Sequence, residues 1–386
     1  MTDAGGSPPP DAPSDAPPLE TEYESAGLFE DVSTDHDDRR ALLDWLHEMG
    51  LSVDDMRDAK DSLALGAVAG DRQLVPGERL TLRAASQRTG VEPALLERLA
   101  TALGLLPIGG APDGEVGLTA DEADSLAGLY ALSDLFSEDQ ALAFLRVLGS
   151  ATARIGETAV SMFLADIESP HVLAGKSELE LAKTTYEANR RVDGLAERLD
   201  PFLRRQILQA IERTRVTMIH ETERFQYRYA VGFVDLTGFT ARSATMDPAE
   251  LAHVLLTFES HAHDVVNAAG GRIVKLIGDE VMIVADRAEN AVEAMSALMT
   301  GYGGADDQIV PRGGLAYGNV LQRGGDYYGS VVNLASRLVD EAVPREVLVT
   351  EEVAEAVAGT ELRFEPAGRR MVKGFADPVT VLSLAT

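Results

Sequence analysis

The spacing of apolar residues changes near Tyr229, and this change excludes any fold made of a single helical bundle or a single sheet domain. Before Tyr229, apolar residues recur every three or four positions, which is the spacing of one helix face. After it, short apolar runs typical of strands alternate with helical segments. The sequence therefore predicts a multidomain chain, with an all-α domain over 39–214, a helical connector over 215–228 and an α+β domain over 229–386.

The individual elements follow from the same spacing. Helical spacing occurs over 42–49, 94–103, 120–132, 139–167 and 178–199. Strands are predicted at 230–236, 272–276, 281–285, 313–320, 346–349 and 380–384, and a helix at 247–269. We expect Gly50 to end the first helix and Asp200-Pro201 to begin another, because proline suits the first position of a helix.

Residues 1–38 differ in composition from the rest of the chain. They contain eleven acidic residues and six prolines, with no lysine or arginine. Such a segment buries too little apolar surface to offset the entropy lost on ordering. We therefore predict a disordered acidic tail over 1–38.

Overall composition excludes several classes of protein. The formal net charge of −29 argues against a nucleic-acid partner, because non-specific binding depends on neutralising phosphates with lysine and arginine. A helix–glycine–helix pattern over 80–105 only weakly resembles a DNA-binding motif, since Arg98 is the one basic residue after Val91 there. Without cysteine there is no disulfide scaffold, cysteine nucleophile or cysteine zinc site. No apolar run reaches membrane-spanning length, and no secretory signal begins the chain, so we expect a soluble cytoplasmic protein.

Two aspartates lie next to apolar runs in the second half. Asp235 ends the first predicted strand, within FVDLTGFT, and an aspartate there is costly to bury unpaired. The turn that follows offers backbone amides to a phosphate, and its residues are Thr237, Gly238, Phe239 and Thr240. Asp279 occupies the turn of a predicted hairpin, within KLIGDE. Together the two carboxylates would suit Mg²⁺ with substrate phosphates, whereas each one alone would more simply cap a turn.

Two further segments carry polar residues in a suggestive arrangement. In GGDYYGSVVNLASR, Asp326 lies in a glycine-flanked loop, and Asn333 and Arg337 are four residues apart on one face of a predicted helix. An amide and a guanidinium so placed can brace a phosphoryl group, although for this segment alone a solvated face is the more common position of both residues. In MVKGF, Lys373 precedes the last strand, where a plain surface lysine is the alternative.

In their order and internal spacing, these four segments resemble the class III nucleotidyl cyclase catalytic domain over about 229–386. The resemblance implies a ferredoxin-like α+β fold and an adenylate cyclase that converts ATP to 3′,5′-cyclic AMP and pyrophosphate. The layout of the whole chain resembles actinobacterial adenylate cyclases in which an all-helical autoregulatory domain precedes the catalytic domain.

The resemblance also implies roles for individual residues. Asp235 and Asp279 match the aspartates that bind two metal ions, Mg²⁺ or Mn²⁺. Lys275 and Asp326 match the pair that recognises adenine. These four positions show no departure from the family pattern for an enzyme that uses ATP.

The remaining matched positions concern the transition state and the phosphates. Asn333 and Arg337 match the pair that stabilises the transition state, and Lys373 is similar to a lysine that holds the triphosphate. In this family the sites lie between two catalytic domains packed head to tail. The resemblance therefore implies a homodimer in which one protomer supplies the metal-binding aspartates and its partner supplies the other residues.

Two other functions remain open from the sequence. The segment GGDYY has a superficial similarity to the signature of diguanylate cyclases, although tyrosines stand where that signature has an acid and phenylalanine. The third possibility is a nucleotide-sensing module without turnover.

Histidines raise the question of regulation by pH. His220 lies in the connector beside two glutamates and is a candidate regulatory residue, because histidine titrates near physiological pH. The alternative is an exposed helical histidine. For His253, His261 and His263 we expect a solvated helix face rather than a metal site.

Overall fold

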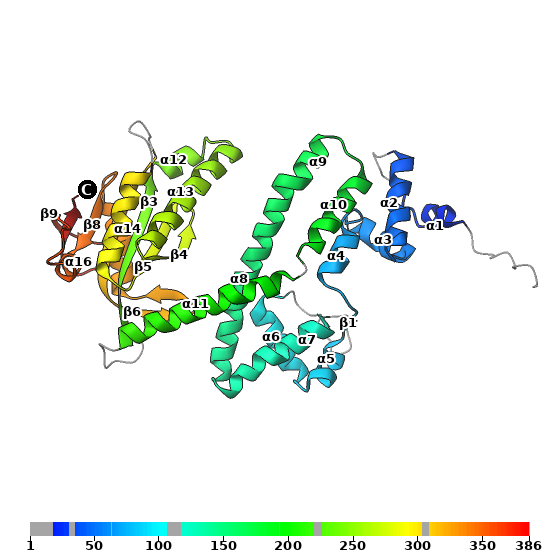
Figure 1. Ribbon diagram of the computed structural model, residues 1–386, viewed down its shortest axis with the longest axis horizontal. Helices are drawn as coiled ribbons and strands as arrows, with labels where there is room; N and C mark the ends of the chain where they lie inside the picture. The colour runs from blue at the N-terminus through cyan, green and yellow to red at the C-terminus, as the bar shows by residue number, and fades with distance from the viewer. Residues whose placement is uncertain are drawn as a thin grey trace, which may run out of the picture. The chain divides into compact units, whose positions relative to one another are not determined.

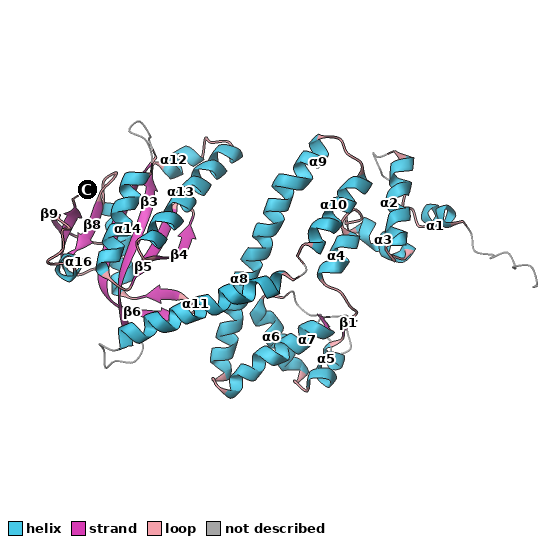
Figure 2. Cartoon of the chain, viewed as in Figure 1, coloured by secondary structure: helices cyan, strands magenta, loops and turns pink. Residues whose placement is uncertain are grey.

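The computed structural model divides into two compact units, Met1–Phe202 and Leu203–Thr386, which are described separately (Figure 1). The structure describes residues 18–30, 35–62, 64–105, 117–192, 194–218, 226–302 and 309–385. The first unit is almost entirely helical, and the second combines a sheet with helices (Figure 2). The predicted order of an all-α domain before an α+β domain is confirmed. Within the described ranges, no helix is both long and apolar enough to cross a membrane.

The helices of the first unit are α1 (Leu19–Ser25), α2 (His36–Glu48), α3 (Val53–Asp61), α4 (Val68–Leu74), α5 (Leu82–Thr89), α6 (Pro93–Leu103), α7 (Ala120–Tyr130), α8 (Glu138–Phe163), α9 (Ser169–Leu173) and α10 (Glu178–Arg190). Short strands β1 (Arg79–Leu80) and β2 (Leu118–Thr119) pair antiparallel. Ser52, Thr119 and Ser177 each begin a helix in a capping box. The hydroxyl of each cap accepts a hydrogen bond from the backbone N–H three residues later, and the acidic side chain there accepts one from the backbone N–H of the cap. Local capping thus defines where several of these helices start.

Two separate apolar cores hold the first unit together. One core is formed by helices α1, α2, α3, α4 and α10. The other is formed by helices α5, α6, α7 and α8. In the second core, Gly149 of α8 packs so closely on α6 that a Cβ atom there would lie 2.0 Å from the Leu103 carbonyl oxygen. Glycine is therefore required for this contact between helices.

The prediction of a disordered tail over 1–38 is wrong from residue 18 onward. Residues 19–25 form α1, and the side chains of Tyr23 and Leu28 are fully buried in the first core. The Tyr23 hydroxyl donates a hydrogen bond to the Leu43 carbonyl oxygen at 3.2 Å. Acidic residues dominate the composition, but the few apolar residues among them share one buried face. Residues 1–17 and 31–34 lie outside the described residues.

The predicted helix start at Asp200-Pro201 is also wrong. Helix α11 (Leu195–Met218) begins before it and contains Pro201. Proline in a helix interior removes one hydrogen bond and clashes with the preceding turn, at a cost of about 3 kcal/mol. The 24-residue helix has enough other hydrogen bonds to continue through this position.

The predicted helical connector over 215–228 is helical only in its first part among the described residues. Helix α11 reaches Met218, and strand β3 already begins at Gln226. Residues 219–225, including His220, lie outside the described residues.

The second unit contains strands β3 (Gln226–Thr237), β4 (Arg272–Ile277), β5 (Glu280–Ala285), β6 (Val310–Arg323), β7 (Asp326–Tyr328), β8 (Val347–Thr350), β9 (Phe364–Arg370) and β10 (Val379–Leu384). They form one sheet in the order β4-β5-β3-β6-β8-β10-β9, with β7 added on β6. The β6–β8 pair is parallel and the other pairs are antiparallel. Sequence spacing predicted six of these strands and missed β7 and β9.

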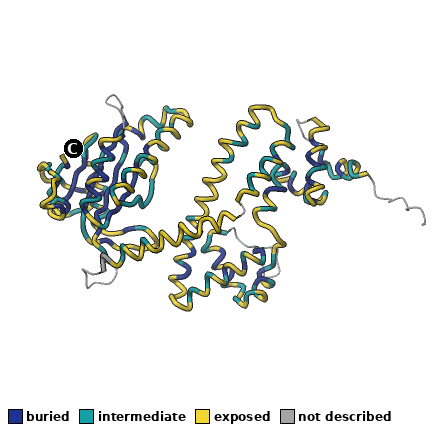
Figure 3. The backbone as a smooth tube through the Cα atoms, viewed as in Figure 1, coloured by how far each residue is buried: buried dark blue, intermediate teal, exposed yellow. Residues whose placement is uncertain are grey.

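Helices pack on both faces of this sheet. They are α12 (Phe239–Ser243), α13 (Pro248–Ala268), α14 (Ala288–Gly301), α15 (Ser330–Glu341) and α16 (Glu351–Ala356). Alternate residues of β3 point to opposite faces. Ala230 and Val234 pack with α13 and α14, whereas Val231 and Phe233 pack with α15. Figure 3 shows the central strands as buried. We call the face of the sheet that packs against α15 the α15 face.

Candidate active site

Three charged side chains form a row across adjacent strands on the α15 face. Asp235 of β3 lies directly opposite Glu280 of β5 on one side and Arg312 of β6 on the other. Directly opposed residues of antiparallel strands point to the same face of a sheet. Asp279 lies beside this row, in the turn between β4 and β5. Strand register thus brings together the two predicted metal-binding aspartates.

Arg312 is the cation of this row. Its Nε and Nη2 atoms donate to Asp235 Oδ2 at 3.2 and 3.0 Å. Its Nη1 atom donates to the carbonyl oxygens of Asp340 and Ala342 at 3.2 and 3.5 Å. Arg312 therefore fixes one carboxylate of the site and ties β6 to the end of α15.

Burial and the neighbouring carboxylates raise the pKa values of Asp279 and Glu280. Burial, followed by the charge of Asp235, raises the pKa of Asp279 to about 6. Burial, followed by the charges of Asp235, Asp340 and Asp279, raises the pKa of Glu280 to about 7. Arg312 opposes both shifts but does not cancel them. The row has an excess of negative charge that a divalent cation would offset.

The carboxylates fit a metal ion that is also bound by substrate. No set of three histidine, aspartate or glutamate side chains in the described ranges is arranged to hold an ion by itself. Mg²⁺ is commonly bound through one or two carboxylates and the phosphates of a nucleotide. Asp235 and Asp279 would supply the two carboxylates of such a site.

The turn after β3 leaves its backbone accessible. Gly238 has a φ of +76°, which favours glycine, and it begins the short helix α12. The Thr237 hydroxyl donates to the Val310 carbonyl oxygen at 2.7 Å, and Phe239 is buried in the core. Gly238 and Thr240 are exposed. Thr237 and Phe239 therefore anchor the turn, while its exposed residues face solvent beside Asp235.

Lys275 and Asp326 meet although they are far apart in the chain. Lys275 Nζ lies 2.5 Å from Asp326 Oδ2, and both side chains are only partly exposed. The backbone N–H of Tyr327 donates to Asp326 Oδ1 at 2.8 Å. The pair offers one donor group and one acceptor group at the same place on the sheet.

Asn333 and Arg337 lie exposed on helix α15, as their spacing predicts. Arg337 forms an ion pair with Asp340 at 3.5 Å. Lys373 is exposed in the turn between β9 and β10. Among the described residues, neither Asn333 nor Lys373 forms a side-chain hydrogen bond or ion pair, so one chain does not join them to the carboxylates.

Sequence reasoning missed Arg312, Glu280 and Asp340. Glu280 directly follows Asp279 in the chain, so the sequence alone predicts that it lies close to the metal-binding aspartates. Arg312 and Asp340 carry no local signal, because only the register of β3 with β6 and the position of α15 bring them to the row.

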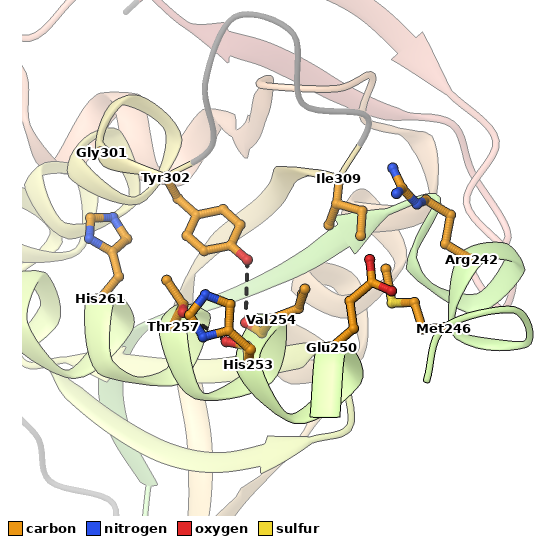
Figure 4. A pocket seen from close by; sticks show the side chains of 10 residues that line it. All are labelled: Arg242, Met246, Glu250, His253, Val254, Thr257, His261, Gly301, Tyr302 and Ile309. Atoms are coloured by element: carbon orange, nitrogen blue, oxygen red, sulfur yellow. Dashed lines mark hydrogen bonds between the residues drawn. The ribbon is translucent and has the colours of Figure 1, made fainter. Parts of the chain in front are cut away.

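The second unit also has a hollow of about 480 Å³ that contains none of these residues (Figure 4). Its polar lining includes Arg242, Glu250, His253 and His261. His253 and His263 are exposed as predicted, but His261 packs against Gly301 and the Tyr302 ring. The hollow does not mark the site of the predicted chemistry.

Two family models match the chain. The adenylate cyclase regulatory domain matches residues 21–214. The adenylate and guanylate cyclase catalytic domain matches residues 308–384. The second match includes Asp326, Asn333, Arg337 and Lys373.

Individual proteins are similar over most of the chain. An uncharacterized protein of Mycobacterium tuberculosis is 34% identical over 90% of each chain. An adenylate cyclase of Streptomyces coelicolor is 34% identical over 78% of this chain and 75% of its own length. A pH-sensitive adenylate cyclase of M. tuberculosis is 28% identical over 89% of this chain and 86% of its own length. The solved structure of the adenylyl cyclase CyaB from P. aeruginosa is 24% identical, covers 42% of this chain and 95% of that chain, and has a TM-score of 0.37.

The regulatory-domain match covers half of the chain, and the Streptomyces relative aligns over three quarters of its own length. The chain therefore belongs to the class III adenylate cyclases of the actinobacterial type, in which a helical regulatory domain precedes the catalytic domain.

Proposed function

We propose that this protein converts ATP to 3′,5′-cyclic AMP and pyrophosphate at sites formed by two copies of the chain. The observation that carries the proposal is the contact between Lys275 and Asp326, 2.5 Å apart, on the same sheet as the paired carboxylates Asp235 and Asp279. This combination supplies a base-recognition group and a place for metal-bound phosphates. The family supports ATP as the substrate.

Lys275 and Asp326 recognise adenine by opposite hydrogen-bonding roles. Asp326 accepts a hydrogen bond from the exocyclic amino group, and Lys275 donates one to a ring nitrogen. Guanine reverses both demands and would leave partly buried polar groups without partners, which is an effective basis for discrimination. The pair therefore favours ATP over GTP.

Asp235 and Asp279 would hold the metal ions, for which we propose Mg²⁺ or Mn²⁺ at two per site. Bound there, such ions would lower the pKa of the ribose 3′-hydroxyl and offset the charge of the pyrophosphate. Arg312 keeps Asp235 in place through two hydrogen bonds. Thr237, Gly238, Phe239 and Thr240 form the turn that receives the phosphates, and Lys373 contributes a further cation.

Asn333 and Arg337 act at the transition state. Asn333 orients the ribose so that its 3′-oxygen lines up with the α-phosphorus. Arg337 offsets the charge that grows on the α-phosphoryl oxygens. Both side chains are exposed on α15, and a partner catalytic domain packed head to tail would supply the carboxylates opposite them. We therefore propose a homodimer with two sites.

Product identification tests the reaction. The protein is incubated with ATP or GTP and with Mg²⁺ or Mn²⁺, and the products are identified by mass spectrometry. Cyclic AMP supports the proposal. Cyclic di-GMP would instead support a diguanylate cyclase, and the absence of product would support a nucleotide-sensing module.

Complementation tests the shared site. An Asp235→Ala variant and an Arg337→Ala variant are each expected to be inactive. Mixed heterodimers carry one intact site and should regain activity. Absence of recovery in mixtures proven to contain heterodimers would contradict the homodimer.

We also propose that the first unit regulates the catalytic units by changing how two of them meet, with His220 as the group that senses pH. Support comes from the pH-sensitive relative and from the match to the adenylate cyclase regulatory domain. His220→Gln should flatten the pH profile of activity in the full chain. The control is His263→Gln, which alters an exposed histidine on α13. Identical profiles for His220→Gln and the unmodified chain would contradict this role.

A further inference from the structure

Strand β4 contains an irregularity that decides where its two basic residues point. Arg272 pairs with Val284 of β5, Ile273 pairs with Ile283, and Lys275 pairs with Met282. The register therefore shifts between Ile273 and Lys275, as in a β-bulge. Bulges of this kind re-aim side chains next to functional sites.

The bulge places Arg272 and Lys275 on the same face of the sheet. Their partners Val284 and Met282 both belong to the core of the α15 face. In a regular strand, residues three positions apart point to opposite faces. Without the bulge, only one of these two basic residues could reach the α15 face.

Arg272 contacts the residue next to Asp326. Its Nη2 atom donates a hydrogen bond to the Tyr327 hydroxyl, and its guanidinium carbon lies 5.3 Å from the centre of the Tyr327 ring. The backbone N–H of Tyr327 in turn donates to Asp326 Oδ1 at 2.8 Å. A continuous set of contacts therefore runs from Arg272 through Tyr327 to Asp326, and from Asp326 to Lys275.

Tyr327, in the middle of this set of contacts, is buried and packs on a second tyrosine. The Tyr327 side chain is 2% exposed and meets the ring of Tyr229 edge to face, with ring centres 5.2 Å apart. Burial raises the pKa of Tyr327, so its hydroxyl stays protonated and neutral. Burial raises the pKa of Asp286, just after β5, and the charges of Arg213 and Arg272 oppose that shift. Arg272 thus contacts the Tyr327 phenol and lies within electrostatic range of a carboxylate.

We propose that Arg272 and Tyr327 are positioning residues that fix the Lys275–Asp326 pair and thereby set the preference for adenine over guanine. The proposal rests on the proposed function of that pair in base recognition. It assigns specificity to two side chains that touch neither the base nor the phosphates. The β-bulge in β4 is the backbone feature that makes the arrangement possible.

The physical reason lies in the geometry that discrimination requires. Asp326 rejects guanine only if its acceptor oxygen stays where the adenine amino group arrives. A loosened Tyr327 would let the backbone of β7 move and carry Asp326 with it. Lys275 is held by the same carboxylate, so both halves of the recognition would weaken together. Asp235 lies on β3 and Asp279 in the β4–β5 turn, outside this set of contacts, so we expect metal binding to be unaffected.

Tyr327→Phe is the main test, because it removes only the hydroxyl that Arg272 contacts. The control is Tyr317→Phe, the same change on a β6 residue that packs on the opposite face of the sheet. Binding of 3′-deoxy-ATP and 3′-deoxy-GTP, which lack the attacking hydroxyl, is measured by calorimetry in the full-length protein with Mg²⁺. Steady-state kinetics with ATP gives KM and kcat.

We expect Tyr327→Phe to raise KM for ATP about fivefold and to lower the ratio of ATP-analogue to GTP-analogue affinity by a similar factor. The value of kcat should stay within about twofold of the unmodified enzyme. Tyr317→Phe should leave all three quantities unchanged. An unchanged affinity ratio in Tyr327→Phe, or a fall in kcat with KM unchanged, would overturn the proposal.

Arg272→Lys provides a second variant that keeps the positive charge near Asp286. It loses the planar guanidinium that contacts the hydroxyl and the ring of Tyr327. We expect the same change in the affinity ratio, with thermal unfolding showing that the protein is folded. An Arg272→Lys variant with unaltered ratio would also contradict the proposal. Failure of the proposed function is distinguishable, because the unmodified protein would then form no cyclic AMP.

Discussion

The two units of this chain use different means to fix their structure. In the second unit, residues far apart in the chain meet in defined pairs on one sheet, as Lys275 does with Asp326 and Arg312 with Asp235. In the first unit, two small cores divide the helices between them, and capping boxes set several helix starts. Strand register fixes the polar pairs of the second unit, whereas the first unit combines local caps with packing between helices distant in the chain, as in the Arg39–Glu178 ion pair at 2.9 Å.

Exposure of apolar side chains follows the same division. Helix α8 leaves Phe144, Ile155 and Met162 at least half exposed, at 50%, 52% and 61%. The central strands of the second unit are buried almost throughout. The chemistry of the catalytic unit therefore rests on buried strands, whereas α8 of the helical unit has fewer buried apolar contacts to resist local opening. This difference predicts where substitutions change chemistry and where they change stability.

The largest expected effect is on catalysis alone. Asp235→Asn keeps the size of the side chain but removes the charge that binds metal, so we expect cyclic AMP formation to fall about a thousandfold. The control is Asp264→Asn, a change of the same kind at an exposed position of α13. Activity assays with Mg²⁺ and with Mn²⁺, together with circular dichroism, make the measurement. If Asp235→Asn is folded and keeps its activity, the Asp235 carboxylate does not bind a metal ion that catalysis requires.

Close packing provides the next test, because each unit contains a glycine that lets the backbone of a neighbouring helix approach closely. A Cβ atom at Gly314 of β6 would lie 2.3 Å from the Ala335 carbonyl oxygen of α15. At Gly149 of α8 it would lie 2.0 Å from the Leu103 carbonyl oxygen. We expect alanine at either position to destabilise its own unit by about 2–3 kcal/mol. Calorimetric unfolding of the full chain measures both effects.

The two glycine variants should differ in activity. Gly314→Ala displaces α15, which carries Asn333 and Arg337, and should reduce kcat strongly. Gly149→Ala disturbs only the helical unit and should leave KM for ATP within about twofold. The control is Gly156→Ala in α8, where a Cβ atom meets nothing within 4 Å. Equal losses of kcat in both variants would show that the two units are not separable in this way.

The pKa of Glu280 provides a smaller effect with a defined sign. Its folded-state pKa of about 7 exceeds the ordinary value of 4.5, so the folded state retains a proton that the unfolded state loses. Stability therefore falls as pH rises from about 4.5 to 7 and stays lower above that range. The shift corresponds to about 3 kcal/mol without solvent screening, which reduces it to about 2 kcal/mol at this partly exposed side chain. Glu280→Gln should unfold at a higher temperature than the unmodified protein at pH 8 and at the same temperature at pH 4. The measurement is made with a chelator, and the exposed α14 change Glu293→Gln is the control.

If Glu280→Gln unfolds at the same temperature as the unmodified protein at pH 8, the acids of the row do not repel one another as described. Glu293→Gln should show no pH-dependent gain, because its side chain is exposed. Added Mg²⁺ should reduce the difference between Glu280→Gln and the unmodified protein, since a bound cation offsets the same charge.

The sequence predicted more of the catalytic unit than of the helical unit. Six strands follow from short apolar runs, and Lys275, Asn333 and Arg337 lie on the predicted elements. Asp326, predicted in a loop, instead begins strand β7. Arg312 and the β4 bulge were not predictable, since each depends on the register of a neighbouring strand. The same limit explains the missed strand β7, which has only three residues and exists through its pairing with β6.

In the helical unit, composition misled the prediction for α1. The acidic residues around Tyr23 suggested disorder, but packing is decided by the apolar residues on one face. The prediction at Pro201 failed for a different reason. Asp200-Pro201 is a local signal for a helix start, but helix α11 begins at Leu195 and continues through both residues. Local rules were reliable where a side chain contacts its own backbone, and unreliable where distant segments decide the outcome.

The smallest expected effect compares one helix cap from each unit. Ser177→Ala removes the cap of α10, in which the Ser177 hydroxyl accepts from the Glu180 N–H at 3.3 Å. Asp247→Ala removes the cap of α13, in which one carboxylate oxygen accepts from the Ala249 and Glu250 N–H groups at 2.9 and 2.8 Å. We expect each to cost about 1 kcal/mol of stability, with the larger loss for Asp247→Ala because its two hydrogen bonds go to a charged acceptor. Neither should change KM for ATP by more than about twofold, since both caps act on their own helix. A larger change of KM in Ser177→Ala than in Asp247→Ala would mean that a local feature of the helical unit controls the catalytic geometry more directly than one within the catalytic unit.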